Sequence, residues 1–289
     1  FTILAMCAAC SNMFSPRSSG KDSKDAPTII FLSGFPDTSD SWSRLAVQFE
    51  ENYHVITMAM PDYDGNQLRR FCGYSLTDMV DGLAFVIEPH LKKKSQVILV
   101  GHDWGAAIGF LYLSAYPGTV DKFVTLDIGR KENVDWVQIF YMTYLAIVFL
   151  LSRVIPDRLA LLFMALYPWK TIGPCPYETE VPMTPRTMKA FMCYPYLKVI
   201  FEVVRSFFTG EQFKFLQMQK PLVHPLPILF LFGRKKRVMF HSPSFLAELE
   251  KDPASAYKEY PDAGHYLHWT NAKEVGSDIL NWLNNKPGG

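Results

Sequence analysis

The chain has 289 residues, of which 49% are hydrophobic, and its formal net charge at neutral pH is +1. A chain of this length and apolar content can bury one large core and still carry an insertion. Its near-neutral charge argues against a nucleic-acid groove or a dedicated acidic partner. The five cysteines are scattered and match neither a metal-ligand spacing nor a disulfide framework, so we expect reduced thiols and no bound metal.

The first 26 residues differ in composition from the rest of the chain. Residues 1–10 form an apolar run that does not begin with Met, and residues 11–26 are rich in Ser, Lys and Asp. The second composition is typical of segments that cannot bury enough apolar surface to fold. The sequence therefore predicts a disordered or truncated leader over residues 1–26.

Regular patterning begins at Thr28, where short apolar strand candidates start to alternate with amphipathic helix candidates. The strand candidates are 28–33, 54–59, 97–100, 123–127, 227–233 and 257–260. The helix candidates between and after them are 39–49, 76–91, 104–116, 245–250 and 272–283. Such alternation predicts an α/β fold with a parallel sheet, helices on both faces, and ligands bound beyond the carboxyl ends of the strands.

The alternation lapses over residues 129–223, which contain apolar helical runs and a Pro-rich loop at 168–185. This segment is too long for a loop, so we interpret it as an inserted helical cap on a core formed by residues 27–128 and 224–286. Its most apolar run, 137–151, is too short to span a membrane. Most runs of this kind are buried helices, and weak membrane association through the cap is the minority alternative.

The strand at 97–100 leads into Gly101-His102-Asp103-Trp104-Gly105 and then directly into a helix. Glycines on both sides permit a sharp, strained turn that raises the central side chain above the sheet. The turn also places the backbone N–H of Trp104 at a helix N-terminus, which favours negative charge. The carboxylate of Asp103 could attack an sp³ carbon and form an enzyme ester, whereas the simpler interpretation is that Asp103 caps the helix.

An aspartyl ester requires activated water, and histidine is the natural base near neutral pH. His265 follows Ala263-Gly264 at the carboxyl end of the last strand candidate. This placement makes His265 the candidate base, and a third group should orient its imidazole.

With these pieces in place, residues 28–283 resemble the α/β-hydrolase superfamily and, within it, the epoxide hydrolase and haloalkane dehalogenase branch. The resemblance rests on Gly34-Phe35-Pro36-Asp37, on an elbow with Asp in place of Ser, and on Ala263-Gly264-His265. It implies an α/β-hydrolase fold without a cofactor, in which Asp103 is the nucleophile and His265 the base. It also implies that the backbone N–H groups of Phe35 and Trp104 form the oxyanion hole.

The acid of the triad is where the sequence departs from the family pattern. Relatives commonly place an Asp shortly after the strand that corresponds to 228–232, whereas this chain has four cations at 234–237, including Lys236. A subgroup of dehalogenases places the acid at the end of the strand that follows the elbow helix, where this chain has Asp127. We expect Asp127 to orient the base, with Glu132 as a weaker candidate; the alternative for Asp127 is capping or pairing with Arg130.

Epoxide hydrolases protonate the leaving oxygen from two cap tyrosines. The cap offers Tyr141 and Tyr144 in its first helical run, and Tyr194 and Tyr196 in a later one. By position, one of each pair matches the family's tyrosines, and we favour Tyr144 and Tyr194 as the catalytic pair. Tyr141, Tyr196 and Trp104 are then expected to contact the substrate.

The sequence thus predicts an epoxide hydrolase-like enzyme that opens a small apolar epoxide to a diol through an Asp103 ester. A haloalkane dehalogenase is the alternative, although Phe35 stands where dehalogenases have a halide-binding Asn. A third alternative, from another class, is a hydrolase-fold binding protein that has lost turnover, suggested by Lys236 and by Ser33 in place of the family's His. We expect no nucleic-acid partner and favour an intracellular location, with membrane association as the alternative.

Overall fold

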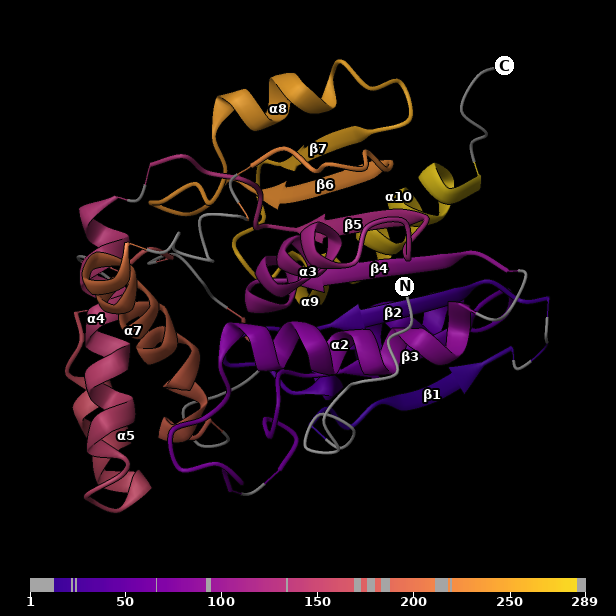
Figure 1. The fold of residues 1–289 in the computed structure, drawn as a ribbon. Coiled ribbons are helices and arrows are strands. Elements are labelled where there is room, and N and C mark those ends of the chain that lie inside the picture. The colour runs from indigo at the N-terminus through magenta and orange to yellow at the C-terminus, as the bar shows by residue number, and fades with distance from the viewer. Residues whose placement is uncertain are drawn as a thin grey trace.

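The computed structural model describes residues 13–21, 23, 25–65, 67–91, 95–133, 135–168, 173–175, 180–182, 188–210, 218 and 220–284. Its centre is a seven-stranded sheet in the order β1-β3-β2-β4-β5-β6-β7, with helices packed against both faces (Figure 1). The strands are β1 (Arg17–Gly20), β2 (Thr28–Leu32), β3 (His54–Met58), β4 (Val97–His102), β5 (Lys122–Leu126), β6 (Ile228–Gly233) and β7 (Ala256–Tyr260).

Neighbouring strands from β2 to β7 pair in parallel, as the alternating pattern predicts, and only β1 is antiparallel to its neighbour β3. The helices of the core are α1 (Ser43–Ala46), α2 (Leu76–Leu91), α3 (Trp104–Ala115), α8 (Pro243–Leu249), α9 (Leu267–Thr270) and α10 (Ala272–Asn284), with the 3₁₀ turns η1 (Ser39–Trp42) and η2 (Val47–Phe49) beside α1.

Alternate residues of each strand enter two separate apolar cores, one on each face of the sheet. On β4, Leu99 belongs to the core that contains α2 and α3, whereas Ile98 and Val100 belong to the core that contains α10. All six residues of β4 are buried, which explains why this strand is a continuous apolar run in the sequence.

The prediction of a disordered leader is wrong for the part of it that the structure describes. Arg17–Gly20 forms the edge strand β1, and Met13 and Phe14 are buried against Gly82 of α2. All four residues of β1 are exposed, and the strand pairs with β3 through its main chain. Its sequence therefore lacks the alternation of apolar and polar residues from which a strand is predicted. Residues 1–12 lie outside the described residues.

Between β5 and β6 the chain forms α4 (Trp136–Leu151), α5 (Asp157–Ala165), the 3₁₀ turn η3 (Ala190–Cys193) and α7 (Tyr194–Thr209), which we call the cap helices. They gather beyond the carboxyl ends of the parallel strands, in the place expected for the inserted cap (Figure 1). Most of the predicted Pro-rich loop at 168–185 lies outside the described residues.

The cap helices expose several large apolar side chains. Trp136, Phe207 and Phe208 are each at least 80% exposed, and α4 carries no charged residue. Within the described ranges, every helix falls short of the length and apolarity that crossing a bilayer requires. Among the described residues, Cys72, Cys175 and Cys193 form no disulfide, and the other two cysteines lie outside the described ranges.

Candidate active site

The predicted elbow is a strained turn between β4 and α3. Asp103 has φ 51° and ψ −124°, a backbone conformation that few L-residues adopt. A side chain at Gly105 would place its Cβ 2.0 Å from the carbonyl oxygen of Leu32, so only glycine fits there. Asp103 makes no side-chain capping bond to α3, and the simple helix-cap interpretation therefore fails.

The loop after β2 contacts the carboxylate of Asp103. The backbone N–H of Phe35 donates to Oδ1 of Asp103 at 2.7 Å. A Cβ on Gly34 would lie 2.3 Å from the backbone nitrogen of Trp104 and 2.4 Å from that same Oδ1, so glycine is required for this close approach. Of the two predicted oxyanion donors, Phe35 therefore contacts the carboxyl group of Asp103 directly, and the backbone nitrogen of Trp104 lies beside the same glycine. Ser33 is buried beside this loop, and its hydroxyl lies 3.4 Å from the carbonyl oxygen of Asp37, so the departure from His leaves the backbone donor of Phe35 in place.

His265 lies between two carboxylates. Its Nε2 is 3.3 Å from Oδ2 of Asp103, and its Nδ1 is 2.5 Å from Oδ2 of Asp127. Burial disfavours the imidazolium, but the two carboxylates outweigh burial and raise the pKa of His265 to about 10. The structure thus places Asp103, His265 and Asp127 in the order nucleophile, base and acid, although the three roles themselves stay predictions.

Asp127 follows β5 directly and is fully buried. Its Oδ1 accepts from the backbone N–H of Gly233 at 3.1 Å and from the ammonium group of Lys236. Burial alone would raise the pKa of Asp127, but the charges of Lys236 and His265 hold it below its usual value. Arg130, the partner considered from the sequence, pairs with Glu248 instead. Glu132, the weaker candidate acid, accepts from the hydroxyl of Ser244 at 2.8 Å in an exposed position, so the structure gives it no role at the imidazole.

Tyr141 and Tyr196 lie together near Asp103, whose charge acts on both phenols. Their hydroxyls lie 3.3 Å apart, and the ring of Tyr196 packs edge-on against Trp104 and Phe35 at centroid distances of 5.3 and 5.2 Å. Burial raises the pKa of both phenols well above the ordinary value, and the charge of Asp103 raises it further. Both hydroxyls are therefore protonated at neutral pH and can act as hydrogen-bond donors.

Tyr144 and Tyr194, the catalytic pair favoured from the sequence, direct their hydroxyls to backbone carbonyl groups. The hydroxyl of Tyr144 donates to the carbonyl oxygen of Phe163 in α5 at 2.5 Å, and that of Tyr194 donates to the carbonyl oxygen of Pro61 at 3.3 Å. Residues 194 and 196 are roughly 200° apart around α7, so only one of them can face the nucleophile.

Tyr266, which the sequence analysis did not select, also lies at the site. It is half-buried beside His265, with ring centroids 5.0 Å apart. Burial raises its pKa well above normal, and the charges of Asp37 and Asp103 contribute to the rise. The sequence feature that could have identified Tyr266 as a site residue is its position directly after His265.

Beneath the elbow lies a buried cluster of Asp37, His102 and His268, whose possible ligand atoms all lie within 4.8 Å of one another. His268 Nε2 is 3.4 Å and His102 Nδ1 is 3.7 Å from Oδ2 of Asp37. The ring Nε2 of His102 also contacts the carbonyl oxygen of His265 at 3.0 Å. These residue types could ligate a metal ion, and their positions join the loop after β2, the elbow and the segment that carries the base.

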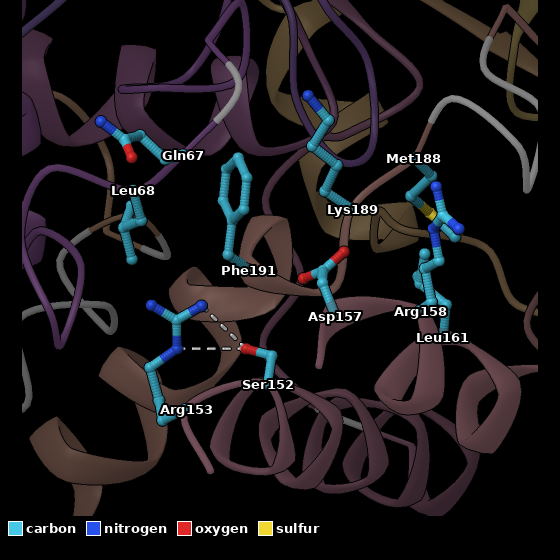
Figure 2. A pocket seen from close by; sticks show the side chains of 10 residues that line it. All are labelled: Gln67, Leu68, Ser152, Arg153, Asp157, Arg158, Leu161, Met188, Lys189 and Phe191. Atoms are coloured by element: carbon cyan, nitrogen blue, oxygen red, sulfur yellow. Dashed lines mark hydrogen bonds between the residues drawn. The ribbon is translucent and has the colours of Figure 1, made fainter. Parts of the chain in front are cut away.

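A separate cavity of about 430 Å³ opens between the loop after β3 and the cap helices (Figure 2). Its lining is mixed: Leu68, Leu161, Met188 and Phe191 lie beside polar residues that include Gln67, Arg153, Asp157 and Lys189. None of the predicted site residues lines this cavity, so it is not the space that faces Asp103.

Comparisons with known proteins agree with this architecture. Residues 27–154 match the family model of the alpha/beta hydrolase fold. Epoxide hydrolase 1 of Caenorhabditis elegans is 28% identical over 112 residues, which are 38% of this chain and 27% of that protein. The match therefore spans only about a quarter of the length of that relative.

Two solved structures extend the likeness to almost the whole chain. An inhibitor complex of the Bacillus megaterium epoxide hydrolase is 20% identical with a TM-score of 0.61, and the superposition covers 94% of this chain and 97% of that one. A haloalkane dehalogenase variant from Bradyrhizobium elkanii is 18% identical with a TM-score of 0.60, covering 93% and 92% of the two chains. The predicted fold and the resemblance to this group of hydrolases are thereby confirmed.

Proposed function

We propose that this chain, which has the α/β-hydrolase fold, is a cofactor-independent hydrolase that opens small apolar epoxides to vicinal diols. The observation that carries the proposal is the position of Asp103. Its carboxylate sits on a strained elbow, accepts from the N–H of Phe35, and faces Nε2 of His265 at 3.3 Å. A carboxylate held in this way can attack carbon and then be regenerated by water.

In the first half-reaction, a carboxylate oxygen of Asp103 forms a bond to one epoxide carbon while the bond between that carbon and the ring oxygen breaks. The ring oxygen takes a proton from the hydroxyl of Tyr141 or Tyr196, whose raised pKa keeps them protonated beforehand. General-acid assistance of this kind contributes about 10²–10⁴ in rate. The product is a hydroxyalkyl ester of Asp103, and the tyrosine recovers its proton from solvent.

In the second half-reaction, water attacks the ester carbonyl and loses its proton to Nε2 of His265. The carbonyl oxygen becomes an oxyanion beside the N–H groups of Phe35 and Trp104, and its collapse releases the diol and restores the carboxylate. Before the ester forms, His265 lies between two carboxylates and is protonated near neutral pH. Esterification removes the charge of Asp103, so the imidazole becomes a competent base only when the ester is ready to be hydrolysed.

The test is a single-turnover experiment with styrene oxide followed by mass spectrometry of the intact protein and of its peptides. We expect a transient mass increase equal to the epoxide, located on Asp103, which clears as diol appears. In ¹⁸O-labelled water the label should enter Asp103 after one cycle and the diol only in later cycles. Absence of an adduct on Asp103 at every time point, or label in the diol on the first cycle, contradicts the proposal.

A haloalkane dehalogenase is the second candidate, and the position of Asp127 favours it. The acid reaches His265 from the end of β5, which is where the dehalogenase subgroup carries its acid. Against it, Phe35 offers no side-chain donor to a halide. Release of bromide from 1-bromobutane without diol from styrene oxide would select this reaction.

One reason to consider a binding protein was Lys236 at the position where relatives carry the acid, and the contacts of Lys236 weaken this reason. Lys236 does not replace the acid; it contacts Asp127, which reaches the base. An adduct that forms on Asp103 and never clears would revive that alternative.

A further inference from the structure

Lys236 is a fully buried cation behind the triad. Its ammonium group contacts Oδ1 of Asp127, and neither side chain is exposed to solvent. A buried cation is retained in a folded protein only where a charge or a set of acceptors compensates it. Here the compensating group is the carboxylate that holds His265 through its other oxygen at 2.5 Å.

The backbone around Lys236 ties this contact to the segment that carries the base. The N–H of Arg234 donates to the carbonyl oxygen of Tyr260 at 3.0 Å, and that of Lys235 donates to the carbonyl oxygen of Ala263 at 2.9 Å. At Gly233 a Cβ would lie 2.0 Å from the carbonyl oxygen of Gly264. Lys236 and His265 are therefore fixed relative to each other by main-chain contacts as well as through Asp127.

The charges around the imidazole change during the proposed reaction. In the free protein His265 faces the carboxylates of Asp103 and Asp127, and the ester removes the first of these charges. The carboxylate of Asp127 would still stabilise the protonated form of His265, whereas the positive charge of Lys236 destabilises that form. The other ionisable groups around this pair are His102, Asp37, Tyr266 and, on the far side of Lys236, His241.

We propose that Lys236 is a positioning residue for ester hydrolysis: it holds Asp127 ionised and directed at His265, and its charge keeps the imidazole unprotonated once Asp103 is esterified. This inference rests on the proposed function. It gives Lys236, which stands where relatives carry the acid, a role in hydrolysis of the Asp103 ester. It predicts no effect of Lys236 on formation of that ester.

The main test compares Lys236→Gln with the wild type in the single-turnover experiment. Glutamine removes the charge but can still donate a hydrogen bond to Asp127. We expect the Asp103 ester to form at the wild-type rate and to clear at least tenfold more slowly at pH 7. The pH at which clearance becomes half-maximal should rise by about one unit or more. Lys236→Arg should clear the ester at close to the wild-type rate.

Lys235→Met is the matched control, because Lys235 is the adjacent lysine, its side chain is 55% exposed and its partner is the surface residue Asp262. It should leave both steps and the pH profile unchanged. Asp127→Asn should lower the pH at which ester clearance is half-maximal, because no carboxylate then balances the charge of Lys236. The double variant Asp127→Asn/Lys236→Met should return this pH toward the wild-type value. Because the double variant removes both charges of the buried pair, it should fold even where a single variant does not, and the pH profile can still be measured.

A titration separates this inference from the proposed function, because it needs no turnover. Asp103→Asn mimics the neutral ester, and the pKa of His265 in that background can be followed by NMR of the imidazole nitrogens. Adding Lys236→Gln should raise this pKa by about one unit or more. An unchanged pKa, or wild-type clearance and pH profile in Lys236→Gln, overturns the inference. Failure of the wild type to form an ester overturns the proposed function and leaves the titration to decide the role of Lys236.

Discussion

Removing single hydroxyl groups from the cap tyrosines tests which of them serve the first half-reaction. The structure divides four tyrosines into two pairs that differ in their contacts, although Tyr141 is close in sequence to Tyr144 and Tyr194 to Tyr196. The hydroxyls of Tyr141 and Tyr196 lie beside each other, and the ring of Tyr196 packs against Trp104. Tyr144 and Tyr194 instead donate to backbone carbonyl groups. Tyr→Phe at each position deletes one hydroxyl and preserves the ring.

The expected magnitudes follow from these contacts. Loss of one donor to a developing alkoxide costs about 10²-fold, so Tyr141→Phe and Tyr196→Phe should each slow formation of the Asp103 ester by that order. The double variant should lose no more than about 10⁴-fold, the upper end for general-acid assistance. Tyr144→Phe should leave the rate unchanged and lower the free energy of unfolding by about 1 kcal/mol, because its hydrogen bond to the carbonyl of Phe163 is lost.

The assay is rapid-quench mass spectrometry of the Asp103 peptide, combined with urea unfolding of each variant. The rate of ester formation reports the tyrosines, and the rate of ester clearance serves as an internal control that none of the four substitutions should change. A large loss of alkylation in Tyr144→Phe or Tyr194→Phe, with normal rates in Tyr141→Phe and Tyr196→Phe, would refute the reassignment of the tyrosines.

Further predictions concern the triad and its charges. Asp103→Asn should form no ester, whereas His265→Gln should form it at the normal rate and retain it, both by mass spectrometry. The pKa of His265 is raised to about 10, so its stabilising effect is complete below pH ~6.5 and is lost as the pH rises toward 10. The free energy of unfolding should therefore fall across that window by up to about 1.4 kcal/mol per pH unit relative to His265→Gln. Lys236→Met should cost about 1–3 kcal/mol in urea unfolding, because the buried carboxylate of Asp127 loses one of its charged partners and keeps His265 as the other. Lys235→Met should change stability by less than about 0.5 kcal/mol.

The parts of the site that follow parallel strands directly were predictable from the sequence. Asp103, Asp127 and His265 each lie just beyond the carboxyl end of a strand, and the ends of parallel strands meet at one edge of the sheet. The elbow additionally carried its own glycines. Hydrophobic periodicity and short motifs therefore singled out Asp103 and His265, whereas Asp127 was selected through the resemblance to a subgroup of dehalogenases.

Features that depend on side-chain direction or on contacts between residues distant in sequence were harder to predict from the sequence. Tyr141 and Tyr144 lie less than one helical turn apart, and their sequence positions do not reveal which hydroxyl turns toward α5. The contact between Lys236 and Asp127 joins residues 109 positions apart, and a run of four cations in a loop normally indicates an exposed surface. Strand β1 escaped prediction because both of its faces are polar and exposed.

Among the described residues, every non-glycine residue with positive φ is an aspartate: Asp62 at 67°, Asp103 at 51° and Asp127 at 67°. Side chains branched at Cβ are poorly tolerated in such conformations, and asparagine, aspartate and glycine are tolerated best. At Asp103 and Asp127, two of the three proposed triad positions, the backbone conformation therefore restricts which substitutions are tolerated, whatever the catalytic role of these residues. In a deep mutational scan scored for cellular abundance rather than turnover, valine and isoleucine should be depleted at positions 103 and 127, and asparagine should be retained at both.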